Sequence, residues 1–72
     1  MNALQTWRHS LELSQPVMAR LIGVPLATYI KWEQETRRPA AIARAHLVML
    51  MWLSKEFPEV FNLIRKQRGI DQ

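Results

Sequence analysis

Apolar residues recur along most of the chain at intervals of three and four, which is the spacing of one face of an α-helix. Leu4, Trp7 and Leu11 follow this spacing near the N-terminus. Gly23 and Pro58 interrupt the pattern, as residues that end one helix or open the next commonly do. The pattern predicts an all-α chain of five helices, over residues 3–11, 14–22, 26–34, 40–56 and 58–66.

The segment 14–34 has the features of two short helices joined by a tight turn. Ser14 is a good N-cap, because its hydroxyl can accept a hydrogen bond from a backbone N–H of the first turn. Gly23 marks the turn, since glycine adopts a positive φ without a steric penalty. Tyr29 and Trp32 are three residues apart, so both side chains should face inward from the second helix.

The helix predicted over residues 40–56 is apolar on nearly all sides, which indicates burial on two faces. One face is expected to pack inside the domain, and it consists of Ile42, His46, Met49, Leu50 and Leu53. The other face and two nearby phenylalanines form an apolar surface, and the last helix can cover only part of it. The remaining surface predicts a homodimer interface. That interface would contain Leu47, Val48, Met51, Trp52, Phe57 and Phe61. The alternative is a monomer in which the last helix covers this whole surface.

Composition narrows the class of protein. The chain has 72 residues, of which 49% are hydrophobic, so we expect one small domain over 1–72, with the segment 40–68 serving core and dimerisation. It contains no cysteine and only two isolated histidines, which predicts no metal site and no cofactor.

The apolar run 42–53 is far shorter than the ~20 residues of a membrane helix and includes Arg44, and no secretory n-region is present. We therefore expect a cytoplasmic protein that does not associate with membranes. The formal net charge of +4 favours a polyanionic partner.

The segment 13–39 resembles the helix-turn-helix of the lambda-repressor-like (Xre/Cro) DNA-binding domains. The residues that carry this resemblance are Gln15, Ala19, Gly23, Val24, Trp32, Glu33, Arg37, Arg38 and Pro39. Two positions depart from the family pattern, because Glu12 and Glu35 stand where many members have glycine. Glu12 leads us to expect a more helical link between the first two helices. Glu35 would carry a strain of about 1 kcal/mol in a left-handed conformation.

The resemblance implies that the helix over residues 26–34 lies in the major groove of double-stranded DNA. Five residues would then face base edges, namely Pro25, Leu26, Ala27, Thr28 and Lys31. Lys31 could donate to guanine O6 and N7, and the neighbouring apolar groups could contact thymine methyls. Four others would contact the sugar–phosphate backbone, namely Gln15, Gln34, Arg37 and Arg38, and Gln15 would also brace the reading residues. Because this reading surface is unusually apolar, specificity would depend on methyl contacts, on DNA shape and on Lys31.

The resemblance also implies a structural ion pair between Arg8 and Glu33, the glutamate that follows Trp32. A guanidinium matches a carboxylate in bidentate geometry, so this pair would join the first helix to the end of the recognition helix. The alternative is two separate solvated charges, which contribute little to stability.

These features together predict a sequence-specific transcriptional repressor, bacterial or phage-encoded, that binds a palindromic operator as a homodimer and regulates its own gene. We expect no enzymatic activity, since the few acidic residues are scattered and no nucleophile–base arrangement is visible. Two alternatives remain open. One is an antitoxin that also represses its operon and binds a toxin partner. The segment from Ala40 onward resembles the C-terminal part of small antitoxins and phage-type regulators. The other is a protein-binding adaptor that retains the helix-turn-helix fold.

Overall fold

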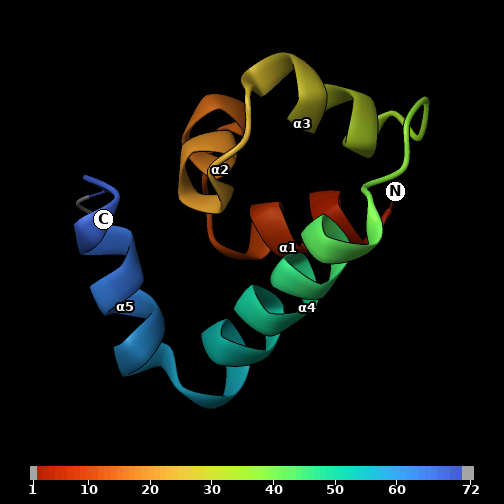
Figure 1. Ribbon diagram of the computed structural model, residues 1–72. Helices are drawn as coiled ribbons and strands as arrows, with labels where there is room; N and C mark the ends of the chain where they lie inside the picture. Colours follow the sequence, from red (N-terminus) through yellow and green to blue (C-terminus); the bar gives the residue numbers. More distant parts are fainter. Residues whose placement is uncertain (1, 71–72) are drawn as a thin grey trace. The chain divides into compact units, whose positions relative to one another are not determined.

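The computed structural model describes residues 2–70, and these residues form five α-helices and no β-strand (Figure 1). The helices are α1 (Ala3–Ser10), α2 (Gln15–Ile22), α3 (Leu26–Glu33), α4 (Ala41–Glu56) and α5 (Pro58–Gln67). The predicted all-α class with five helices is confirmed, and each boundary lies within two residues of its predicted place. None of the helices described over residues 2–70 combines the length and the apolar character needed to cross a membrane.

The chain divides into two compact units at the junction of Arg38 and Pro39. We call residues 2–38, which carry α1, α2 and α3, the N-terminal unit. Residues 39–70, which carry α4 and α5, are the C-terminal unit. The helix-turn-helix predicted from the sequence therefore lies wholly within the N-terminal unit, and the residues predicted for dimerisation lie wholly within the C-terminal unit.

Helix α3 holds the N-terminal unit together, because it contacts both α1 and α2 (Figure 1). Met18 and Leu21 from α2 and Tyr29 from α3 are fully buried, and Trp32 is buried one turn after Tyr29. Burial of a large apolar side chain stabilises a fold by about 1.5–3 kcal/mol. The predicted inward orientation of Tyr29 and Trp32 is confirmed.

Four of the five helices end in the same way, with a residue in the left-handed region. These residues are Glu12 (φ 56°), Gly23 (φ 92°), Glu35 (φ 61°) and Gly69 (φ 74°). In each case the next residue donates its backbone N–H to the carbonyl oxygen five residues earlier, at 2.9 to 3.3 Å. These bonds satisfy carbonyl groups that the last turn of a helix leaves without an intrahelical partner.

The helical link that Glu12 led us to expect between the first two helices is not formed. Helix α1 stops at Ser10, and Glu12 takes the left-handed conformation that a glycine would adopt there. The N–H of Glu12 donates to the carbonyl of His9 and that of Leu13 donates to Arg8, at 3.1 and 3.3 Å. The closed turn therefore prevails over the intrinsic preference of glutamate for helix, at the cost of strain at Glu12.

In the C-terminal unit, α5 packs against α4, and Leu47, Leu50, Phe61 and Ile70 are buried. The predicted division of apolar residues between the core and the dimer interface is wrong at four positions. Ile42 and Met49, which were expected inside, are exposed, whereas Leu47 (4% exposed) and Phe61 (2% exposed) are buried rather than available to a partner. Leu47 lies three residues before Leu50, so the two share the buried face of the helix. A helix that is apolar all round gives no periodic signal from which this face could be identified.

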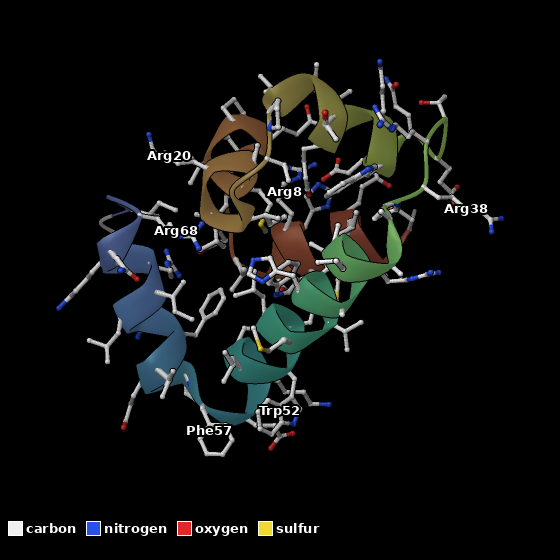
Figure 2. All side chains as sticks on the ribbon, in the orientation of Figure 1. Arg8, Arg20, Arg38, Trp52, Phe57 and Arg68 are labelled. Carbon is white, nitrogen blue, oxygen red and sulfur yellow. The ribbon has the colours of Figure 1, made fainter. Side chains whose placement is uncertain are left out.

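The remaining residues predicted for the dimer interface still leave an apolar area in contact with solvent. Val48, Trp52 (53% exposed) and Phe57 are exposed, and Met51 is half-buried. The rings of Trp52 and Phe57 lie edge to face with their centroids 5.1 Å apart, where α4 turns into α5 (Figure 2). We refer to Val48, Trp52 and Phe57 as the exposed apolar surface.

Candidate nucleic-acid interface

Two eight-residue helices and a turn form the framework of the candidate site. Ser14 caps α2 by accepting a hydrogen bond from the N–H of Val17 at 3.4 Å, and α2 ends at Gly23. Pro25 follows in an extended conformation (φ −60°, ψ 145°) and precedes the first residue of α3. The N-cap residue Pro25 makes no side-chain hydrogen bond to the first turn of α3. The two short helices and the glycine turn predicted for this segment are thus present.

The residues predicted to contact bases lie along the outer side of α3. Pro25, Ala27 and Lys31 are exposed, Leu26 is 39% exposed, and Thr28 is half-buried. The buried side of the same helix carries Tyr29, Trp32 and Glu33. The predicted reading residues therefore share one accessible face, which is apolar near the start of the helix and carries a positive charge at Lys31.

Three of the residues predicted to contact phosphates follow α3. Gln34, Arg37 and Arg38 are all exposed, and Figure 2 shows Arg38 extending away from the loop. The loop is held by Thr36, whose backbone N–H and hydroxyl both donate to the carbonyl of Lys31, at 3.1 and 3.3 Å. Both arginines thus lie just beyond a turn that is closed onto α3.

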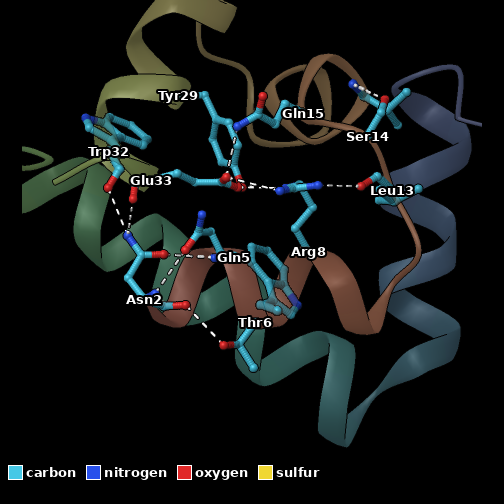
Figure 3. Close-up of polar contacts among 12 residues, drawn as sticks. Asn2, Gln5, Thr6, Arg8, Leu13, Ser14, Gln15, Tyr29, Trp32 and Glu33 are labelled. Carbon is cyan, nitrogen blue, oxygen red and sulfur yellow. Dashed lines mark hydrogen bonds and ion pairs between the residues drawn. The ribbon is translucent and has the colours of Figure 1, made fainter.

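A buried carboxylate joins all three helices of the N-terminal unit (Figure 3). The side chain of Glu33 is 1% exposed and accepts two hydrogen bonds from Arg8, from Nε at 2.7 Å and from Nη2 at 3.1 Å. Gln15 donates from Nε2 at 3.0 Å, and the hydroxyl of Tyr29 donates a further hydrogen bond. Arg8 also donates from Nη1 to the carbonyl of Leu13 at 3.2 Å. The predicted pair of Arg8 and Glu33 is formed, in the bidentate geometry expected.

The hydrogen bonds to Glu33 outweigh the cost of burying its charge. Burial raises the pKa of the Glu33 carboxyl. The hydrogen bonds from Arg8, Tyr29 and Gln15 together lower this pKa by more than burial raises it, so the net shift is downward. The hydrogen bond to Glu33 raises the pKa of the Arg8 guanidinium. Burial is the main cause that raises the pKa of the Tyr29 hydroxyl, and the hydrogen bond to Glu33 raises it as well. The network therefore holds an ionised carboxylate and guanidinium beside a neutral phenol.

The position of Gln15 differs from what its predicted phosphate contact alone suggests. Gln15 is the first residue of α2, and its side chain is half-buried and turned toward Glu33 (Figure 3). The sequence predicted that it would support the reading residues, and the structure brings it to Glu33 at the end of the helix that carries them. This contact joins α2 to α3 through a side chain rather than through packing alone.

Asn2 has a role that the sequence analysis missed. Its Oδ1 accepts a hydrogen bond from the N–H of Gln5 at 3.0 Å, while its Nδ2 donates to the carbonyls of Trp32 and Glu33 at 3.0 and 3.1 Å. Gln5 returns the contact by accepting from the N–H of Asn2, which completes a capping box. The spacing of Asn2 and Gln5 could have indicated this cap. Nothing in the sequence indicates that the same amide also binds the last turn of α3.

Comparisons of the chain with protein-family models, with curated proteins and with solved structures find no match. What the site can do is therefore inferred from the side chains of the N-terminal unit and their contacts.

Proposed function

We propose that the chain is a sequence-specific, double-stranded-DNA-binding transcriptional repressor of the lambda-repressor-like (Xre/Cro) class. In this proposal α3 enters the major groove, and Lys31 donates to guanine O6 and N7 while Leu26, Ala27 and Thr28 contact base methyl groups. Gln34, Arg37 and Arg38 contact the phosphate backbone and fix the register of the protein on the duplex.

The observation that carries this proposal is the contrast between the two sides of α3. Its inner side is attached to α1 and α2 through Glu33, whose carboxylate receives hydrogen bonds from Arg8 and Gln15. Its outer side leaves Lys31 and the first-turn residues accessible. A base-reading helix requires both properties, because its side chains must reach the groove from a rigid support.

We also propose that the repressor acts as a homodimer on a palindromic operator. Exposed aromatic side chains in contact with each other are typical of protein interfaces, and the exposed apolar surface contains Trp52 and Phe57. A two-fold contact between copies would present two recognition helices to successive major grooves, about 34 Å apart.

The same surface supports a second function, that of an antitoxin or adaptor whose partner is another protein. A toxin or other protein partner could cover Trp52 and Phe57 in place of a second copy of the chain, while the N-terminal unit still bound DNA. The two proposals differ in what covers the exposed apolar surface, so the state of assembly of the isolated protein distinguishes them.

The function is tested by selecting binding sites from random duplex DNA and measuring affinity by fluorescence anisotropy at several salt concentrations. Lys31→Ala should weaken binding to the selected site by about 1–3 kcal/mol and binding to random DNA much less, because it removes a base contact. Arg37→Ala should weaken both alike and lower the salt dependence, since it removes a phosphate contact.

Three outcomes would contradict the proposal in different ways. If the wild-type protein does not bind duplex DNA at low salt, DNA is not its ligand. Equal affinity for selected and random duplexes would exclude sequence-specific recognition. Equal losses on both duplexes for Lys31→Ala would remove that residue from the readout.

A further inference from the structure

The buried carboxylate of Glu33 has as many hydrogen-bond donors as it can accommodate. Oε2 accepts from Arg8 Nε and from the Tyr29 hydroxyl, and Oε1 accepts from Arg8 Nη2 and from Gln15 Nε2. An ionised carboxylate offers about four acceptor positions, so all of them are used. The contact with Gln15 is thus part of a complete set, and Glu33 has no capacity left for a different donor.

This saturation fixes the orientation of the Gln15 amide. A carboxylate can only accept hydrogen bonds, so the NH₂ group of Gln15 must face Glu33, and a flipped amide would place two oxygens against each other. Nε2 carries two N–H groups and gives one of them to Glu33 at 3.0 Å. The second N–H therefore has a fixed direction at the start of α2, rather than the freedom of an unsupported glutamine side chain.

The start of α2 has few backbone donors of its own. Pro16 has no N–H, and the N–H of Val17 donates to the Ser14 hydroxyl. A phosphate approaching this end of α2 would consequently depend on Gln15. The negative charge of Glu33 does not oppose such an approach, because Arg8 neutralises it at 2.7 Å.

We propose that Glu33 is a positioning residue for DNA binding, which holds the Gln15 amide so that its second N–H donates to a phosphate oxygen. This inference rests on the proposed function. It assigns to Glu33 a role in affinity beyond its structural pair with Arg8. It also implies that α1 and α3 act together on the phosphate contact at α2.

The test uses Gln15→Met, which keeps the length and volume of the side chain but removes both N–H groups, while leaving the pair of Arg8 and Glu33 intact. Its affinity should fall about tenfold on selected and random duplexes alike, since a phosphate contact carries no sequence information. The salt dependence should stay unchanged, because glutamine is neutral and releases no counterion on binding. Gln67→Met, an exposed glutamine on α5, is the matched control and should bind like the wild type.

Glu33→Gln tests the positioning step itself. It should lower DNA affinity to a similar extent, and the double variant with Gln15→Met should bind no worse than Gln15→Met alone, because both changes remove the same contact. Circular dichroism verifies that each variant is folded. If Glu33→Gln does not fold, Gln15→Met still tests the phosphate contact on which the inference depends.

Unchanged affinity of a folded Gln15→Met variant would overturn the inference while leaving the proposed function in place. Additive losses from the two changes would also overturn it, since Glu33 would then act by a separate route. Failure of the wild-type protein to bind DNA would instead overturn the proposed function, so the two failures are distinguishable.

Discussion

The two units of this chain are stabilised by different kinds of contact. In the N-terminal unit, Arg8, Gln15 and Tyr29 all donate to one buried carboxylate, and Asn2 binds the last carbonyls of α3. In the C-terminal unit, α4 and α5 meet through apolar side chains, and other large apolar side chains remain exposed. Hydrogen bonds fix direction, whereas apolar contacts mainly require burial.

This difference matches what each unit is proposed to do. Base readout needs side chains held at defined positions, and directional contacts between α1, α2 and α3 meet that need within a single chain. An apolar helix pair has no such requirement and gains free energy whenever another surface covers it. The comparison therefore teaches that the N-terminal unit is completed by its own side chains, while the C-terminal unit is suited to completion by a partner.

The largest effect is expected from breaking the polar network of the N-terminal unit. Arg8→Ala or Glu33→Ala should each lower the free energy of unfolding by about 3–5 kcal/mol, because each leaves the other charge buried without its partner. The double variant should lose much less than the sum of the two. Urea denaturation followed by tryptophan fluorescence measures all three. Additive losses would mean that the two charges are not coupled in solution.

The C-terminal unit should instead respond in its assembly. Trp52→Glu places a charge in the exposed apolar surface and should weaken a dimer by about 2 kcal/mol or more, as expected for a central aromatic contact, with little change in helical content. Ile42→Glu is the matched control, because Ile42 is 87% exposed and lies nearly three turns earlier on α4. Sedimentation velocity at micromolar concentrations reads out both variants. A wild-type protein that is monomeric on and off DNA would contradict the homodimer.

Acid should weaken the N-terminal unit through Glu33. Its pKa in the folded protein lies below the ordinary value of 4.5, so below that pH the unfolded chain takes up a proton that the folded chain does not. The contribution of Glu33 is complete above about pH 4.5 and is lost as the pH falls through the folded pKa, at no more than about 1.4 kcal/mol per pH unit. Glu33→Gln lacks this group.

The free energy of unfolding should accordingly fall more steeply with acid for the wild type than for Glu33→Gln. Urea titrations between pH 7 and pH 3 give both curves, and the difference between them removes the contribution of the other carboxylates. Two parallel curves would show that Glu33 titrates alike in the folded and unfolded chains.

The sequence supported predictions where residue type alone restricts conformation. Gly23 and Pro58 marked helix boundaries, and the spacing of Tyr29 and Trp32 identified the inner face of α3. The pair of Arg8 and Glu33 was expected from the family resemblance. The contacts of Gln15 and Asn2 with the end of α3 could not be predicted, because they join positions 18 to 31 residues apart whose meeting depends on tertiary packing. The buried face of α4 could not be predicted either, since apolar residues lie on nearly all sides of that helix.

The smallest effect, and the only expected gain in stability, concerns the turn that follows α3. Glu35 has a φ of 61°, and the turn is closed by hydrogen bonds from the N–H groups of Glu35 and Thr36 to the carbonyls of Trp32 and Lys31, at 3.2 and 3.1 Å. A side chain in this conformation costs roughly 1–2 kcal/mol, and glycine returns part of that gain through the greater entropy of the unfolded chain. Glu35→Gly should therefore raise the free energy of unfolding by about 0.5–1 kcal/mol.

Glu35→Ala separates the backbone from the charge, because it removes the carboxylate but keeps a Cβ in the strained conformation. Chemical denaturation should rank glycine as the most stable, with alanine close to the wild type. If alanine stabilises as much as glycine, the gain comes from removing a negative charge at the C-terminal end of α3, where the helix dipole disfavours it, and the strain at this turn is negligible. If neither stabilises, the hydrogen bonds of the turn already offset the strain, and the left-handed residue after α3 is as well accommodated as the rest of the network in the N-terminal unit.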